Sequence, residues 1–285
     1  MEIIKAEILG YCFGVRRAVE KAEQALVENT ESPVYSLGPL IHNKTTLNRL
    51  TKSGMKTAEN ISEIPEGSAV IIRAHGVPPQ VISELEEKKC RIIDATCPRV
   101  KASQKIAEKN RDNLIVFTGD AEHGEVKGIA GYGGKNFHLI QNLQDAENLA
   151  DESDDLRFQK GVLFSQTTFS ENEFDKIKKV LGGCFSNLEV LNTICPATKE
   201  RQDSLLELCS KVDGIVVVGG KQSANTIRLF QTARENCAKA VHIENASELP
   251  EEFFELDKIG ITAGASTPDE IINEVCEVLN VRSSR

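Results

Sequence analysis

The sequence of 285 residues lacks tryptophan, and aromatic residues make up only 5% of it. Aromatic side chains are the usual platforms on which single-stranded nucleic acid stacks, so their scarcity argues against that class of binder. Positive charge is also in deficit, since 34 Lys and Arg against 43 Asp and Glu give a formal net charge of −9. An anionic ligand would therefore need a local pocket of hydrogen-bond donors rather than a basic surface.

Long hydrophobic runs are absent as well. No apolar stretch approaches the ~18 residues that span a bilayer. The first residues, MEIIKAE, include acids and do not follow the pattern of a secretory signal. We therefore expect a cytoplasmic protein that binds neither membrane nor nucleic acid, and a monomer or weak dimer.

Cysteine, by contrast, is abundant for a protein of that compartment, with eight residues. A disulfide scaffold is disfavoured there and at this chain length. Five cysteines lie in no recognisable motif, and those in helix-like stretches are most simply core residues. These five are Cys90, Cys184, Cys209, Cys237 and Cys276.

The other three cysteines share a local pattern. Residues 94–98 (DATCP) and 192–196 (NTICP) each follow a strand-like run and precede a polar, helix-forming stretch. Proline is well placed just inside a helix start, and the start of a helix favours a thiolate. Residues 10–15 (GYCFGV) form a third corner of this kind. We predict that Cys12, Cys97 and Cys195 meet and hold a metal cluster.

Two further patterns also occur three times. An apolar strand ends in glycine at Gly38, Gly119 and Gly220 and leads into a polar loop. A second strand leads into small polar loops that contain His75, Thr167 and Ser266. The cysteines are 85 and 98 residues apart, so the repeat is irregular but near 90 residues.

Continuous apolar strands that alternate with helices indicate parallel α/β sheets, whose ligands bind at the carboxyl ends of the strands. We therefore predict three similar α/β lobes in a pseudo-threefold trefoil around a central cluster. The predicted domains are residues 14–96, residues 97–194, and residues 195–285 together with 1–13. The N-terminal strand, residues 2–9, would complete the third lobe.

The spacing of the three cysteines leaves several kinds of site open. A structural zinc site usually draws on closely spaced cysteine pairs, which are missing here. A four-iron cubane can be held from three distant corners, with one iron left open. Zinc, a catalytic thiol and buried cysteines remain the alternatives.

Polar residues in the same loops suggest a ligand. His42, His75 and His123 are three of only five histidines, and each lies in a predicted site loop, although a lone histidine is more often structural. Histidine, hydroxyl and amide side chains suit diphosphate oxygens. The hydroxyl and amide donors are Thr167, Ser223, Asn225 and Ser266. Glu125, two residues after His123, is a candidate proton donor or merely an exposed loop acid.

These stretches resemble the family of 4-hydroxy-3-methylbut-2-enyl diphosphate reductases of the non-mevalonate isoprenoid pathway. The resemblance covers nearly the whole chain in order. The matching residues are 10–15 (GYCFGV), 38–43 (GPLIHN), 73–77 (RAHGV), 94–98 (DATCP), 122–126 (EHGEV), 165–168 (SQTT), 192–196 (NTICP) and 266–268 (STP). In residues 223–225 (SAN) the family often has a second serine where Ala224 stands, so a contact there would use the backbone N–H.

The resemblance implies a reductive dehydroxylation of an allylic diphosphate to isopentenyl and dimethylallyl diphosphates. It implies a 4Fe–4S cluster on Cys12, Cys97 and Cys195 whose fourth iron binds the substrate, and a ferredoxin or flavodoxin as electron donor. Glu125 would supply the proton through Thr167, with His123 assisting. The implied substrate-binding residues are His42, His75, His123, Thr167, Thr168, Ser223, Ala224, Asn225 and Ser266.

Two other functions remain compatible with parts of the pattern. A non-catalytic iron–sulfur redox sensor would need the cysteines but not the His, Glu and Thr loops. A zinc hydrolase acting on phosphate esters would use the loops with a different metal.

Overall fold

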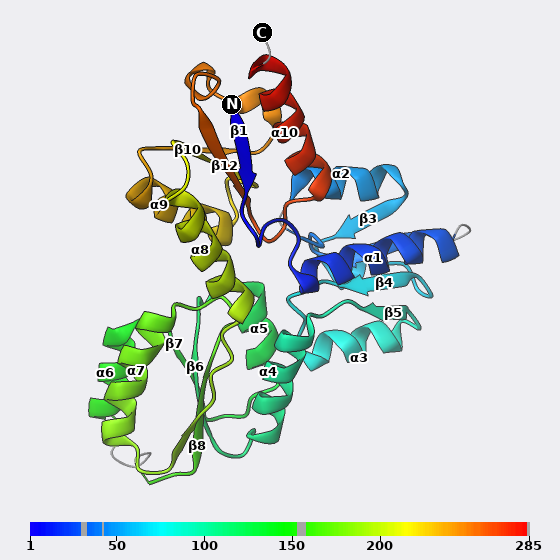
Figure 1. Cartoon of the computed structure of the whole chain (residues 1–285). Coiled ribbons are helices and arrows are strands. Elements are labelled where there is room, and N and C mark those ends of the chain that lie inside the picture. The colour runs from blue at the N-terminus through cyan, green and yellow to red at the C-terminus, as the bar shows by residue number, and fades with distance from the viewer. Residues whose placement is uncertain (30–32, 42, 153–157, 284–285) are drawn as a thin grey trace. The chain divides into compact units, whose positions relative to one another are not determined.

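The structure is a computed structural model that describes residues 1–29, 33–41, 43–152 and 158–283. Strands and helices alternate along the chain (Figure 1). The strands are β1 (Glu2–Lys5), β2 (Val34–Leu37), β3 (Met55–Ala58), β4 (Ala69–Ile72), β5 (Arg91–Asp94), β6 (Leu114–Thr118), β7 (Phe137–Ile140), β8 (Gly161–Ser165), β9 (Leu188–Val190), β10 (Gly214–Val218), β11 (Lys239–Ile243) and β12 (Lys258–Ala263). The α-helices are α1 (Phe13–Glu28), α2 (Lys44–Lys52), α3 (Pro79–Glu87), α4 (Pro98–Lys109), α5 (Gly124–Ala130), α6 (Leu143–Glu152), α7 (Glu171–Cys184), α8 (Pro196–Cys209), α9 (Ala224–Asn236) and α10 (Asp269–Ser283). Short 3-10 helices are η1 (Ile61–Glu63), η3 (Ala246–Glu248) and η4 (Glu251–Phe253).

The strands form three parallel sheets of four strands each, and all three sheets have the same order. The orders are β3-β2-β4-β5, β7-β6-β8-β9 and β11-β10-β12-β1. In the third sheet β1 takes the place of the fourth strand and pairs with β12, Glu2 lying opposite Lys258 and Lys5 opposite Ile261. The predicted α/β class with three similar lobes is therefore confirmed.

The chain forms two compact units. The first contains Met1–Glu20, Pro39–Gly54 and Pro196–Arg285, and the third sheet lies within it. The second contains Lys21–Gly38 and Met55–Cys195, with the other two sheets. The three domains expected at residues 14–96, 97–194 and 195–285 with 1–13 stay a prediction.

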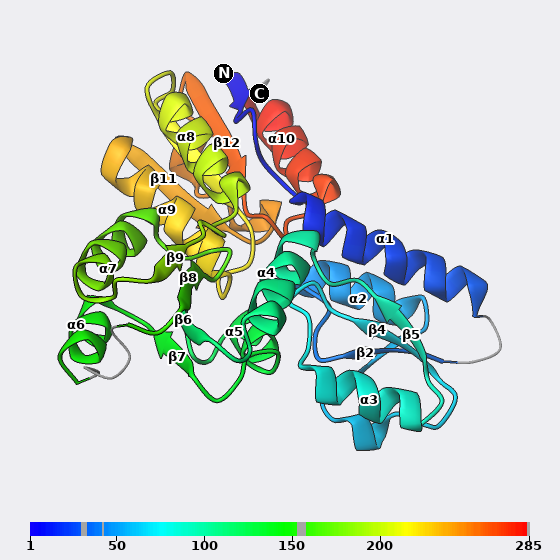
Figure 2. The same ribbon diagram turned by 90° about the horizontal axis from the view of Figure 1, so that it is seen from below.

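The central strands β6, β8 and β10 are buried along their whole length, because helices cover both faces of their sheets. In the second sheet, α6 and α7 pack on one face, while α4 and α5 pack on the other (Figure 2). In the third sheet, α10 covers the face that carries Val216 and Val218. Helices α8 and α9 cover the opposite face, which carries Ile215 and Val217.

The edge strands β3, β7 and β11 were not anticipated from the sequence. Each of them includes a polar residue and at least two positions that are only partly buried or exposed, as in the sequence KAVHI of β11, and so lacks the continuous apolar run of a central strand. Strand β1 is also shorter than the expected residues 2–9, since it ends at Lys5.

The described helices include none that is both long and apolar enough to cross a membrane.

Candidate active site

The three cysteine corners are built in the same way. Each cysteine follows the fourth strand of its sheet and directly precedes a helix, α1, α4 or α8. Each backbone N–H donates to a carbonyl in the loop after the third strand. These bonds run from Cys12 to Ala265 (3.0 Å), from Cys97 to Ala74 (2.9 Å) and from Cys195 to Thr167 (2.7 Å). The thiols are thus held at equivalent places beside the loops that carry Ser266, His75 and Thr167.

Side-chain turns shape two of these corners. Asp94 Oδ1 accepts the backbone N–H of Thr96 at 2.9 Å, and Asn192 Oδ1 accepts that of Ile194 at 3.0 Å. Such turns are a local habit of Asp and Asn. Burial works to raise the pKa of Asp94, but hydrogen bonds from Lys101 and Thr96 bring it below the ordinary value. The carboxylate therefore stays ionised and holds the segment that leads to Cys97.

The glycine loops are also equivalent, with one correction. In every sheet, the glycine N–H in the loop after β2, β6 or β10 donates to the carbonyl at the end of the neighbouring edge strand, β3, β7 or β11. These bonds run from Gly38 to Ala58 (2.8 Å), from Gly119 to Ile140 (3.0 Å) and from Gly219 to Ile243 (2.8 Å). Gly219, rather than the Gly220 used in the sequence comparison, is thus the counterpart of Gly38 and Gly119.

With this correction, predicted site residues fall into matching positions. Four residues after the glycine, His123 and Ser223 cap α5 and α9. Two residues further on lie Glu125 and Asn225, in the first turn of each helix. Ala224 is the first residue of α9. His42, the corresponding residue of the first sheet, lies outside the described residues.

Glu125 and Thr167 form a closed, buried pair. Glu125 Oε1 accepts the backbone N–H of Thr167, and Oε2 lies 2.7 Å from the Thr167 hydroxyl. Burial raises the pKa of Glu125 to about 6, although the two hydrogen bonds from Thr167 act in the opposite direction. A carboxyl group with that pKa is half-protonated near pH 6 and still holds a protonated fraction near neutral pH, which suits a proton donor.

Two predicted histidines lie beside this pair in the second unit. The rings of His75 and His123 meet edge to face, with centroids 4.9 Å apart. His123 Nδ1 accepts the backbone N–H of Glu125 at 3.2 Å, so in the neutral ring Nε2 carries the proton. Close by, the hydroxyl of Thr168 accepts a hydrogen bond from Gln166 at 3.0 Å. The ring of His123 is thereby oriented, with the donor hydrogen on Nε2.

Arg73 is a residue of this region that the sequence reasoning left without a role. Its guanidinium packs against two glycines: a Cβ added at Gly38 would lie 2.9 Å from Nη1, and one at Gly124 would lie 2.7 Å from Nη2. Its Nε is buried and finds no hydrogen-bond partner among the described residues. Burial lowers the pKa of Arg73, while Glu59 acts to raise it. The sequence did contain a signal for a role of Arg73, because it places a cation directly after the buried strand β4 and two residues before His75.

In the first unit, the predicted ligand-binding side chains surround the start of α9. Ser223 Oγ accepts the backbone N–H of Thr226 at 3.4 Å. The side-chain Nδ2 of Asn225 is buried, and no partner for it exists among the described residues. Thr267, beside Ser266, donates its hydroxyl to Val218 O at 3.0 Å and ties the two loops together. A buried, unsatisfied donor is costly, which indicates an acceptor supplied by a ligand.

The predicted residues thus gather in two groups. The second unit brings together Cys97, Cys195, His75, His123, Glu125, Thr167 and Thr168, and the first brings together Cys12, Ser223, Asn225 and Ser266. All eight cysteines lie within the described residues, and none is in a disulfide. Within those residues, no three His, Cys, Asp or Glu side chains converge as ligands of one metal ion.

Comparisons with known proteins point to one family. Residues 3–280 match the family model described as LytB protein. A protein of Treponema denticola named 4-hydroxy-3-methylbut-2-enyl diphosphate reductase is 47% identical over 282 residues, which cover 96% of this chain and 98% of that protein. A protein of the same name from Aquifex aeolicus is 40% identical over 96% of this chain and 94% of its own length.

Solved structures give the same answer. The structure of an (E)-4-hydroxy-3-methyl-but-2-enyl diphosphate reductase, described as the terminal enzyme of the non-mevalonate pathway, matches with a TM-score of 0.78 and 36% identity, over 99% of this chain and 100% of that one. That of an E-1-hydroxy-2-methyl-but-2-enyl-4-diphosphate reductase from Plasmodium falciparum matches with a TM-score of 0.84 and 29% identity, over 98% and 87%. The chain therefore belongs to the LytB family of 4-hydroxy-3-methylbut-2-enyl diphosphate reductases.

Proposed function

We propose that this protein reduces (E)-4-hydroxy-3-methylbut-2-enyl diphosphate to isopentenyl and dimethylallyl diphosphates. The reaction consumes two electrons and two protons, replaces the C–O bond of the allylic alcohol by a C–H bond and releases water. The buried Glu125–Thr167 pair carries the proposal, because it provides a carboxyl group of pKa about 6 joined to a hydroxyl at 2.7 Å. The names of the relatives supply the substrate.

The cofactor we propose is a 4Fe–4S cluster held by Cys12, Cys97 and Cys195. The three corners fit such a cluster, because each thiol is held singly at the start of a helix. In a cubane cluster each thiolate ligand binds a different iron. Three thiolate ligands would leave one of the four irons without a protein ligand. The bound cluster would supply a Lewis acid for the substrate oxygen and the electrons of the reduction.

Glu125 is the proton source in this proposal. Protonated Glu125 donates to Thr167 Oγ1 across the 2.7 Å contact, and the Thr167 hydroxyl then passes its own proton to the leaving oxygen. The backbone N–H of Thr167 binds the other carboxyl oxygen and keeps the group in one orientation. The fixed donor on His123 Nε2 binds the substrate beside this path.

Asn225 is the residue with the strongest support in the set that would bind the diphosphate. Its buried Nδ2 needs an acceptor, and a phosphoryl oxygen satisfies it with a charge-assisted hydrogen bond. Ser223, Ser266, the backbone N–H of Ala224, Thr168, His75 and His42 complete the proposed set. Binding the remote diphosphate positions the C–O bond for reduction.

The test is an assay of protein purified and reconstituted without oxygen. We expect about four iron and four acid-labile sulfide per chain, and formation of both product diphosphates with a one-electron donor such as reduced dye, ferredoxin or flavodoxin. An intact cluster without product would instead identify a redox sensor. Absence of sulfide after reconstitution, with zinc bound, would overturn the reductase altogether.

A further inference from the structure

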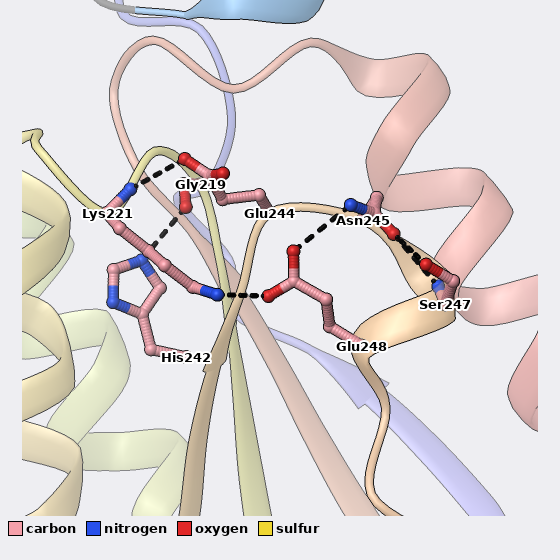
Figure 3. Close-up of polar contacts among 7 residues, drawn as sticks. All are labelled: Gly219, Lys221, His242, Glu244, Asn245, Ser247 and Glu248. Atoms are coloured by element: carbon pink, nitrogen blue, oxygen red, sulfur yellow. Dashed lines mark hydrogen bonds and ion pairs between the residues drawn. The ribbon is translucent and has the colours of Figure 1, made fainter.

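Two side chains at the end of the edge strand β11 bind the backbone of the loop that precedes α9. His242 Nε2 lies 2.9 Å from the carbonyl oxygen of Gly219, and Glu244 Oε1 accepts the backbone N–H of Lys221 at 2.9 Å (Figure 3). Both contacts reach main-chain atoms, so they fix the path of the loop whatever its side chains do. The loop ends at Ser223 and Asn225, the residues proposed to bind the diphosphate.

The loop has a shape that needs such support. Gly219 has a φ of 151°, a region that side chains rarely adopt. A Cβ there would also lie 2.7 Å from Thr267 Oγ1 and 2.9 Å from Thr226 Oγ1. The turn then closes with the N–H of Ser223 donating to Gly220 O at 3.0 Å. The backbone between Gly219 and Ser223 is therefore a tight turn that reaches α9 in one defined orientation.

Further contacts join Lys221 to the segment that follows Glu244. Glu248 accepts hydrogen bonds from Lys221 Nζ and from Asn245 Nδ2 (Figure 3). Asn245 in turn caps η3 by accepting the backbone N–H of Ser247 at 3.1 Å. Behind these contacts, Ala246, Leu249 and Phe253 are buried in the core of the third sheet. The segment after β11 is thus anchored in the core of the third sheet, and the contact between Lys221 and Glu248 adds a further link to the loop.

The second sheet has the same arrangement with a neutral side chain. Gln141, directly after β7, accepts the backbone N–H of Ala121 through Oε1 at 3.0 Å. Ala121 and Lys221 both lie two residues after the loop glycine, and Gln141 and Glu244 both follow the residue whose carbonyl binds that glycine. The shared feature is an acceptor oxygen at this position, and the charge of Glu244 is not needed for it.

We propose that His242 and Glu244 are positioning residues for the diphosphate-binding loop, which they hold in its bound conformation before substrate arrives. This inference rests on the proposed function only for the identity of the ligand. Physically, a loop that is already ordered loses less conformational entropy on binding, so the support lowers KM with little effect on kcat. Neither residue touches the reacting atoms in this proposal.

The test compares Glu244→Ala with Glu244→Gln, since glutamine restores the acceptor as Gln141 does in the second sheet. Glu252→Ala is the matched control, because it removes the same charge from an exposed position of the same unit. Amide hydrogen exchange of the free holoenzyme, followed by mass spectrometry, reports on residues 219–226. We expect faster exchange there in Glu244→Ala, wild-type exchange in the other two variants, and unchanged exchange in β12 throughout.

The second readout is steady-state kinetics with the diphosphate substrate. Loss of one hydrogen bond predicts a KM increase of roughly 2- to 10-fold in Glu244→Ala, with kcat nearly constant and KM restored in Glu244→Gln. His242→Leu and His242→Gln form a second pair with the same expectation, because glutamine supplies a donor for Gly219 O. Equal exchange and equal KM in all variants would overturn the inference.

Asn225→Ala separates this inference from the proposed function. A raised KM in Asn225→Ala but not in Glu244→Ala or His242→Leu would refute the positioning role and leave the diphosphate site intact. An unchanged KM in Asn225→Ala, together with faster loop exchange in Glu244→Ala, would show a supported loop that does not bind the diphosphate.

Discussion

The loops before α5 and α9 are built on one plan and end in opposite chemistry. Both begin with a glycine bonded to the neighbouring strand, and both cap their helix four residues later. Two residues beyond the cap, one has the buried carboxyl of Glu125, fully engaged with Thr167, and the other has Asn225 with an unpaired buried Nδ2. One loop therefore has its buried polar groups satisfied within the protein, whereas the other leaves a buried donor that the proposed diphosphate would satisfy.

Both loops depend on the cluster that the cysteine corners would hold. Substitution of a corner cysteine is therefore expected to have the largest effect on activity. Cys97→Ser should remove most of the bound iron and abolish turnover, because serine replaces the proposed thiolate ligand. Cys184→Ser, at the end of α7, is the control and should keep both. Iron and sulfide analysis of the two variants checks this, and a full cluster in Cys97→Ser would refute the ligand assignment.

The next largest effect is expected when the acidic proton of Glu125, in the loop before α5, is removed by substitution. Glu125→Gln keeps the shape of the side chain and can still bind Thr167, but it has no acidic proton. We expect kcat to fall by roughly 10²-fold or more, with KM nearly unchanged. The exposed neighbour Glu122 provides the control, Glu122→Gln. Wild-type turnover in Glu125→Gln would exclude Glu125 as the proton source.

The second loop should show the reverse split between the kinetic constants. Asn225→Ala removes one hydrogen bond to a charged ligand, so KM should rise about tenfold or more while kcat changes little. Asn225→Asp should weaken binding further, because a carboxylate repels the diphosphate. Steady-state kinetics on both variants tests this. If kcat fell in Asn225→Ala while KM stayed unchanged, Asn225 would act in the reaction step as Glu125 does. The proposed difference between the two loops would then be wrong.

The closed pair also predicts a pH dependence of stability. Because the folded-state pKa of Glu125 is raised from 4.5 to about 6, the folded protein binds more protons than the unfolded chain between these values, and stability falls as pH rises through them. The full cost above pH 6 is about 2 kcal/mol. Glu125→Gln should escape this cost.

Urea unfolding of wild type and Glu125→Gln between about pH 4 and pH 7.5 checks it. The stability of the variant relative to wild type should increase by about 2 kcal/mol across that range. A constant difference would mean that the buried carboxyl group is not destabilised by its surroundings.

Several elements could be predicted from the sequence because their causes are local. Central strands such as β6 and β10 are short apolar runs that end in glycine, and proline after Cys97 and Cys195 marks the start of a helix. Edge strands such as β11 escaped because they are half-exposed and mixed in composition. The positions of His242 and Glu244 could not be predicted either, because they depend on β11.

The sequence by itself determined the three strand-and-corner repeats, the three cysteines and the family, because motif order and apolar patterning are properties of the linear chain. Only the tertiary structure decided that β1 pairs with β12, that Arg73 packs between Gly38 and Gly124, and that Glu125 is buried against Thr167 with a raised pKa. Pairing and burial join residues far apart in the chain. The protonation of a carboxyl group depends on the water and the hydrogen-bond donors that the fold leaves around it.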